Sequence, residues 1–402
     1  MLKQLLPERQ NFDGSDIIFT LNSAAQKRAA TGEAVINATV GALLDDNGKL
    51  IVLNTVMELY AQLTPMEIAP YAPIAGDAAY VLALTQRHWP ALQSYGVGVA
   101  TPGGSGALAL SIRNLLAHGD TLLTAAPFWG PYATLSVENE VRLETVPYPS
   151  INAPIDIAAW RAKFEIVLKK QGRLLFWLND PCHNPTGRSL SANDRRAVLQ
   201  LFREVSSLGA VTLLLDLAYL DYTREPNAVR EALDDYAAFA REGGVLVCAS
   251  LSLSKAFTIY GARAGALVFP WVNDSHLQNA LNTSCRGTFS NCARAPMSVL
   301  MRMTRDTAAQ QRLAAEHAHW NVVLQERAIA VDDALRAEGL AGAPWQGGFF
   351  ITIECQNPYD VCERLQALGV FVVPMPEGLR VGICGLKKQD APSFAAAVRQ
   401  CI

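Results

Sequence analysis

Two charged side chains stand where apolar segments end, at positions suited to chemistry on a small molecule. Lys255 follows the apolar segment 245–250. Burial lowers the pKa of a lysine and makes its amine nucleophilic, as in lysines that form Schiff bases, although a lysine extending over the surface from a strand end is the alternative. Asp216 follows the uncharged run 211–215, and Tyr219 lies three residues further on. Open α/β sheets place ligands at such strand ends, whereas a helix N-cap is the alternative for the aspartate.

Two segments rich in glycine or proline have the composition of ligand-binding turns. Segment 101–108 holds three glycines and runs into a helix expected over Ala107 to His118. Closely approaching amides at a helix N-terminus bind phosphate, but the segment fits neither standard glycine motif, and a simple tight turn is the alternative. Segment 179–187, with two prolines and a closing glycine, predicts a rigid turn that holds the Asn184 side chain toward a ligand, or a purely structural turn.

Composition and charge favour a small-molecule function. The 402 residues are 50% hydrophobic and 18% charged, with a net charge of −3, so no overall field draws the protein to nucleic acid or an anionic membrane. No uncharged apolar run of about 18 residues occurs, and Glu8 and Arg9 interrupt the start of the chain where a signal peptide would be apolar. We therefore expect a cytoplasmic protein without membrane contact.

Cysteine and histidine spacing argues against disulfides and metal. The eight cysteines are scattered and form no CxxC pair, which predicts reduced core residues. His317 and His319 are two apart on a helical stretch and so point to different faces. We expect no metal site.

The arrangement of apolar runs predicts an α/β fold. From about residue 100 to 270, short runs alternate with segments of helix length, which indicates βαβ units and a mostly parallel sheet flanked by helices. The expected strands are 121–126, 174–178, 211–215, 245–250 and 264–269.

Both ends of the chain are expected to form a smaller α+β domain. Strands are predicted at 349–354, 370–373 and 379–383, and segment 297–338, without proline or glycine, predicts one long helix or two abutting ones. We predict three parts of the chain: residues 1–47 as an N-terminal segment and part of the small domain, 48–314 as the large cofactor-binding domain, and 315–402 as the C-terminal small domain.

Taken together in order, these motifs resemble those of fold-type I pyridoxal-phosphate (PLP) enzymes, and among them the class I aminotransferases of the aspartate and aromatic type. The resemblance covers most of the chain. Its motifs are Val40–Ala42, Tyr71–Gly76, Gly104–Leu108, Pro127–Gly130, His183–Gly187, Asp216–Tyr219, Ser252–Lys255 with Arg263, Arg286–Asn291, and Arg380.

The resemblance implies roles around the cofactor ring. Lys255 would form the Schiff base with the cofactor and move the proton between the substrate Cα and the cofactor. Asp216 would pair with the ring nitrogen and keep it protonated. Tyr219 and Asn184 would hydrogen-bond the ring's phenolic oxygen, and Trp129 would stack on the ring face.

The resemblance also implies which residues would bind the cofactor's phosphate. The amides of Gly104 and Ser105 would bind it together with Ser252 and Arg263, and Tyr71 would join them from a second subunit. A homodimer with shared active sites is therefore expected.

Substrate recognition follows from the same resemblance. Arg380 would bind the substrate's α-carboxylate through a bidentate ion pair, and Gly41 would leave room beside this pair. Arg286 would reach from the neighbouring subunit to a distal carboxylate, with a surface ion pair as the alternative. The chain departs from the pattern where Tyr132 replaces a histidine, Leu43 and Phe289 replace tyrosines, and Cys292 replaces a proline.

We predict a PLP-dependent aminotransferase that moves an amino group from an aspartate-type or aromatic L-amino acid to a 2-oxo acid such as 2-oxoglutarate, by a ping-pong Schiff-base mechanism. Two alternatives stay open at this point. One is a PLP-dependent lyase or decarboxylase on the same fold, and the other is a non-catalytic sensor of PLP or an amino acid.

Overall fold

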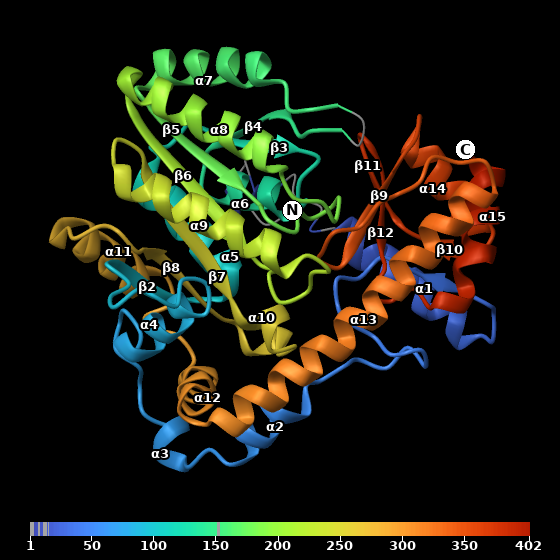
Figure 1. Cartoon of the computed structure of the whole chain (residues 1–402), viewed down its shortest axis with the longest axis horizontal. Helices are drawn as coiled ribbons and strands as arrows, with labels where there is room; N and C mark the ends of the chain where they lie inside the picture. Colours follow the sequence, from blue (N-terminus) through green and yellow to red (C-terminus); the bar gives the residue numbers. More distant parts are fainter. Residues whose placement is uncertain (1–3, 7–8, 11–13, 15, 151–152) are drawn as a thin grey trace.

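The central feature of the fold is a seven-stranded sheet, seen in the left half of Figure 1. In the order β2-β8-β7-β6-β5-β3-β4, all neighbours are parallel except that β8 runs antiparallel to β2 and β7. The strands are β2 (Val97–Pro102), β3 (Thr121–Ala126), β4 (Arg142–Pro147), β5 (Arg173–Leu178), β6 (Ala210–Leu217), β7 (Leu246–Ser252) and β8 (Ala264–Phe269). The computed structural model describes residues 4–6, 9–10, 14, 16–150 and 153–402.

Helices cover both faces of this sheet, so the strands are apolar on both sides. Leu213 and Leu215 belong to one core and Leu214 to the other, as the alternation of side chains along a strand requires. Helices α7 (Ile157–Gln171), α8 (Ala192–Val205) and α9 (Pro226–Glu242) pack on the first core. Helices α5 (Gly103–Leu115), α6 (Pro131–Glu138) and α11 (Ser275–Thr288) pack on the second. The predicted α/β fold with a mostly parallel, covered sheet is confirmed.

The two ends of the chain meet in a smaller α+β unit, also as predicted. Strand β1 (Ile36–Asn37) pairs in parallel with β10 (Val370–Phe371). The strands β11 (Val373–Met375), β12 (Gly378–Gly382) and β9 (Phe350–Glu354) form an antiparallel sheet in that order. The helices of this part are α1 (Ile17–Ala30), α14 (Pro358–Ala367) and α15 (Ala391–Cys401).

A long helix joins the two parts of the molecule. The predicted helical segment 297–338 is two abutting helices, α12 (Arg294–Arg305) and α13 (Thr307–Ala337), with Asp306 as the N-cap of the second. In Figure 1, α13 runs from the region of α12 to the smaller unit. Residue 314 lies inside α13, so the predicted boundary at 314/315 would cut a continuous helix, and the domain limits stay a prediction.

Three short helices precede the large sheet, and they are α2 (Asn54–Ala61), α3 (Pro65–Ile68) and α4 (Ala78–Gln86). All eight cysteines are free and seven are buried, as predicted, whereas Cys355 is partly exposed. Among the described residues, no helix has both the length and the apolarity to span a membrane, and no cluster of three or more His, Cys, Asp or Glu side chains has the arrangement of a metal site.

Candidate active site

A cavity of about 390 Å³ lies at the carboxyl ends of β6 and β7, beside the start of α5. The smaller unit closes its other side with segment 40–42 and Arg380. Parallel sheets place ligands at this edge. Eleven of the thirteen residues predicted for the site line this cavity: Gly41, Gly104, Ser105, Trp129, Asn184, Asp216, Tyr219, Ser252, Lys255, Arg263 and Arg380.

Lys255 presents its amine to this cavity from α10 (Leu253–Ala256), the short helix that directly follows β7. The amine donates a hydrogen bond to the Gly41 carbonyl at 2.6 Å. The pKa of Lys255 is lowered to about 8, mainly by burial and in smaller part by the nearby Arg263 and Arg380, while Cys384 opposes the decrease. The site therefore holds an amine that loses its proton near neutral pH and can attack an aldehyde.

Asp216 is buried at the end of β6 and is held by a tyrosine. The Tyr132 hydroxyl donates to Asp216 Oδ2 at 2.7 Å. Burial raises the pKa of Asp216 to about 6, and this hydrogen bond opposes the rise. Because burial also raises the pKa of Tyr132 well above its usual value, the phenol keeps its proton and stays a donor. The carboxylate is thus suited to pair with a protonated ring nitrogen.

Asn184 and Tyr219 lie together beside Asp216. Asn184 Nδ2 donates to the Tyr219 hydroxyl at 3.2 Å, and the backbone N–H of Asn184 donates to Asn179 Oδ1 at 2.5 Å. Asn179 Nδ2 in turn donates to the Asp216 carbonyl at 2.7 Å. The buried Asn184 Oδ1 has no partner in the described structure, so this amide has hydrogen-bonding capacity for a ligand.

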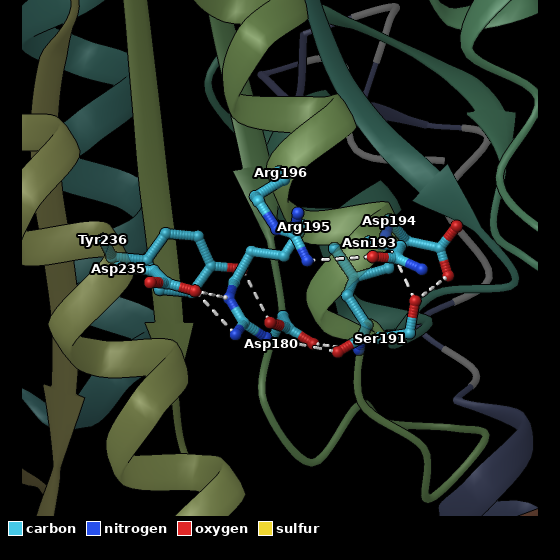
Figure 2. A network of polar contacts seen from close by, with 9 residues as sticks. Asp180, Ser191, Asn193, Asp194, Arg195, Arg196, Asp235 and Tyr236 are labelled. Carbon is cyan, nitrogen blue, oxygen red and sulfur yellow. Dashed lines mark hydrogen bonds and ion pairs between the residues drawn. The ribbon is translucent and has the colours of Figure 1, made fainter.

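A buried network holds the turn that carries Asn184. Asp180 is fully buried and accepts hydrogen bonds from the Tyr236 hydroxyl at 2.6 Å and from the Leu190 amide at 2.7 Å. Figure 2 shows the Arg195–Asp235 ion pair beside it, with a 2.7 Å contact. Because Arg195 lies on α8 and Asp235 and Tyr236 lie on α9, two long helices fix the start of this turn.

The glycine-rich segment predicted to bind a phosphate lies in the first turn of a helix, which starts earlier than expected. Helix α5 begins at Gly103 rather than Ala107 and ends at Leu115 rather than His118. The glycines therefore form the first helical turn itself, where the amides lack partners within the helix. Gly103 has φ +72°, and a Cβ there would lie 2.6 Å from Arg263 Nη2. Arg263 is thus packed directly against the amides that would bind a phosphate.

Arg380 is buried with unused hydrogen-bonding capacity. Its side chain is 3% exposed, Nη2 donates to the Thr39 carbonyl at 2.8 Å, and the guanidinium lies 4.4 Å from the centre of the Phe350 ring. Its buried Nε has no partner in the described structure. Burial lowers the pKa of Arg380 to about 10, so it remains charged and suited to a carboxylate. A Cβ on Gly41 would lie 2.7 Å from Phe350 Cζ, so glycine is needed there.

Two predicted residues lie outside this cavity in the single chain. Tyr71 is 89% exposed. Arg286 is exposed at the end of α11 and donates to Ser290 Oγ at 2.5 Å. The fold of one chain therefore does not bring these side chains to Lys255.

The structure adds cavity residues that the sequence analysis did not assign to the site. Tyr260 and Phe350 line it, as do Asp16, Ile18 and Phe19 of the first helix and its N-cap. The spacing of Tyr260, five residues after Lys255 in a turn-forming segment, was an available signal for the first of these. The α1 residues gave none, because α1 packs on β1, β10 and β11, and the last two strands lie near the other end of the chain.

Comparison with known proteins agrees with this geometry. The family model described as "Aminotransferase class I and II" matches residues 33–398. The chain belongs to this family. An aromatic-amino-acid aminotransferase of Pseudomonas aeruginosa is 30% identical over 238 residues, 57% of each chain. An aspartate aminotransferase of the same organism is 30% identical over 266 residues, 63% of this chain and 62% of the other. These alignments thus span less than two thirds of either relative.

Solved structures of aminotransferases have the same fold. An aminotransferase from Anaerococcus prevotii superposes with a TM-score of 0.91 at 27% identity, with 98% of both chains covered. An aromatic-amino-acid aminotransferase from Burkholderia pseudomallei, covalently bound to pyridoxal phosphate, gives a TM-score of 0.80 at 21% identity over 97% of this chain and 98% of the other. The predicted family resemblance is confirmed by the family model and by these folds.

Proposed function

We propose that this protein is a PLP-dependent aminotransferase. It would move the amino group of an aspartate-type or aromatic L-amino acid to a 2-oxo acid such as 2-oxoglutarate, in two successive half-reactions. The observation that carries the proposal is the placement of the Lys255 amine and the unsatisfied Arg380 guanidinium in one cavity. The names of the two Pseudomonas relatives support the donor class.

The cavity residues fit the cofactor. Asp216 would pair with the ring nitrogen, Asn184 and Tyr219 would bind the ring oxygen, and Trp129 would cover one face. A second set would hold the phosphate: Gly104, Ser105, Ser252 and Arg263. When bound, PLP supplies an aldehyde that condenses with an amine and a ring that withdraws electrons from Cα.

The chain's own side chains would orient the substrate and move one proton. Arg380 would bind the α-carboxylate through its partnerless Nε and a terminal nitrogen, which fixes the direction of the Cα–H bond. Lys255 would accept the Cα proton and return it. An amine with a pKa of about 8 suits this exchange near neutral pH, because it can hold or release a proton there.

We also propose a homodimer with shared sites. Tyr71 would reach the phosphate, and Arg286 the distal carboxylate, of the neighbouring subunit's cavity. The exposure of both side chains supports this arrangement.

The test is a donor panel. Purified protein with added PLP is incubated with each L-amino acid and 2-oxoglutarate, and glutamate is measured. We expect glutamate with aspartate or aromatic donors, and none with the Lys255→Ala variant. Borohydride reduction followed by peptide mapping should place the cofactor on Lys255. Absence of glutamate with every donor, or an adduct on another residue, would reject the proposal.

A further inference from the structure

The amine of Lys255 is surrounded by aromatic rings. Lys255 Nζ lies 4.6 Å from the centre of the Tyr260 ring, 5.7 Å from that of Phe349 and 5.9 Å from that of Tyr219. All three distances are within the roughly 6 Å at which a ring face attracts a cation. Among these rings, Tyr260 is the nearest.

Tyr260 is held by one hydrogen bond at its ring hydroxyl and one at its backbone. Its hydroxyl accepts a hydrogen bond from the Leu43 amide at 3.0 Å, and its backbone carbonyl accepts one from Arg263 Nη1 at 3.0 Å. Leu43 lies two residues after Gly41, whose carbonyl accepts from the Lys255 amine. The segment that accepts from the Lys255 amine therefore also donates to the hydroxyl of the ring, and the ring turns its face toward the amine.

The charges around the amine disfavour its ammonium form. Arg263 and Arg380 both lower the pKa of Lys255, and burial lowers it more than either. Among the described residues, Cys384 is the one ionisable group that opposes them, but burial raises the pKa of that thiol to about 11, so it carries no charge near neutral pH. The ring faces and the Gly41 carbonyl therefore provide the stabilisation that an ammonium ion receives here.

We infer that Tyr260 is a catalytic residue whose ring face stabilises Lys255 as an ammonium ion when that amine has taken up the substrate's Cα proton. In this step the Cα–H bond breaks, the proton forms a new N–H bond at Nζ, and the electron pair of the broken bond stays with the substrate and cofactor. The inference rests on the proposed function. Tyr219 and Phe349 contribute less, because their centres are more than 1 Å further from the amine.

Loss of this ring has two effects of opposite sign. In Tyr260→Leu the ammonium form loses stabilisation, so the pH midpoint for capture of PLP by the cofactor-free protein falls by about half to one unit. Capture at pH 7 then becomes about threefold faster or more, because more of the amine is neutral. The same amine is a weaker base, so exchange of the substrate's Cα hydrogen in D₂O becomes about threefold slower or more. A purely structural defect would slow both reactions.

Matched variants separate the ring from the hydroxyl. Tyr260→Phe keeps the ring and removes the acceptor for the Leu43 amide, and its capture midpoint should equal that of the unaltered protein. Tyr260→Met, which is flexible and apolar but has no ring, should repeat the Leu result and serves if Tyr260→Leu does not fold. An unchanged midpoint in the ring-lacking variants, or a joint fall of capture and exchange, would overturn the inference. If the unaltered protein captures no PLP on Lys255, the proposed function fails, and this inference with it.

Discussion

The Asp216 carboxylate is paired with a phenol that is itself packed among aromatic rings. Tyr132 contacts Trp129 edge to face at 5.8 Å and Trp177 at 4.8 Å between ring centres. Trp129 is the residue proposed to cover the cofactor ring. One side chain therefore positions both the partner proposed for the ring nitrogen and the partner proposed for the ring face. Since Tyr132 stays protonated, its phenol remains a hydrogen-bond donor to Asp216 across neutral pH.

The Tyr132→Phe variant should lower kcat about tenfold or more, because the carboxylate loses a charge-assisted hydrogen bond worth about one pKa unit or more. Affinity for PLP should weaken most at low pH, where Asp216 is then protonated. Tyr132→His should restore part of the activity, since an imidazole N–H also donates. Tyr222→Phe is the matched control, because the buried Tyr222 hydroxyl has no partner in the described structure. Equal kcat in the Tyr132 and Tyr222 variants would contradict this role.

Asp216 also predicts how the stability of the cofactor-free protein depends on pH. Its pKa is about 6 in the folded chain against an ordinary 3.8, so the folded state holds a proton that the unfolded state has lost between these values. The stability that this proton provides is complete below pH 4 and is lost as the pH rises through about 6, by about 3 kcal/mol at most. Asp216→Asn does not titrate. In urea unfolding, the free energy of unfolding of the Asn variant relative to that of the unaltered protein should increase as the pH rises to about 6, and then stay constant. A difference that is the same at every pH would contradict this linkage.

At the scale of elements, the first turn of α5 is constrained at Gly103. The left-handed conformation of Gly103 and its contact with Arg263 both exclude a side chain. Gly103→Ala should weaken PLP binding about tenfold or more, because the new methyl group displaces Arg263 from the amides that we propose bind the phosphate. Gly119→Ala is a matched control, since Gly119 also has positive φ (+80°) but a Cβ there would meet nothing within 4 Å. Titration of both cofactor-free variants with PLP should show the loss only in the first.

The sequence allowed the elements to be predicted better than their ends. Strands β3 and β8 have the predicted bounds, because their apolar runs stop abruptly at polar or turn residues. The predicted start of α5 was four residues too late. Glycine is a poor helix former, and its place in the first turn depends on packing against Arg263. The contact of Tyr132 with Asp216 joins positions 84 apart, and no local pattern predicts such a pair.

At the scale of the whole molecule, one chain does not account for two of the predicted site residues. The exposure of Tyr71 and Arg286 fits a role in a partner's cavity. Exposed apolar side chains near Tyr71 in the sequence also fit an interface between subunits, and these are Met57, Met66, Ile68 and Ile74. The sequence shows that Tyr71 and Arg286 match a family pattern. It does not show which subunit's cavity they enter, because that depends on how two chains associate.

Mixed dimers test that assignment. Lys255→Ala and Arg286→Ala chains are each expected to fail with acidic substrates. When they are refolded together, a mixed dimer contains one cavity with an intact Lys255 and an intact Arg286 from the other chain. About a quarter of the original activity should return, because half of the dimers are mixed and each has one working site. No recovery from two inactive parents would mean that Arg286 acts within its own chain, and an active Arg286→Ala parent would mean that it has no role.

The hydrogen bond from Arg380 to the Thr39 carbonyl joins positions 341 residues apart. During translation, Thr39 is synthesised early, and nearly the whole chain follows it before its partner Arg380 is synthesised. Strands β3 to β8, with Lys255 and Asp216, are complete well before that moment. The end of the site that we propose binds a carboxylate is therefore completed last. A premature stop codon late in the message would retain Lys255 and Asp216 in the chain but remove Arg380, the residue proposed to bind the substrate's carboxylate.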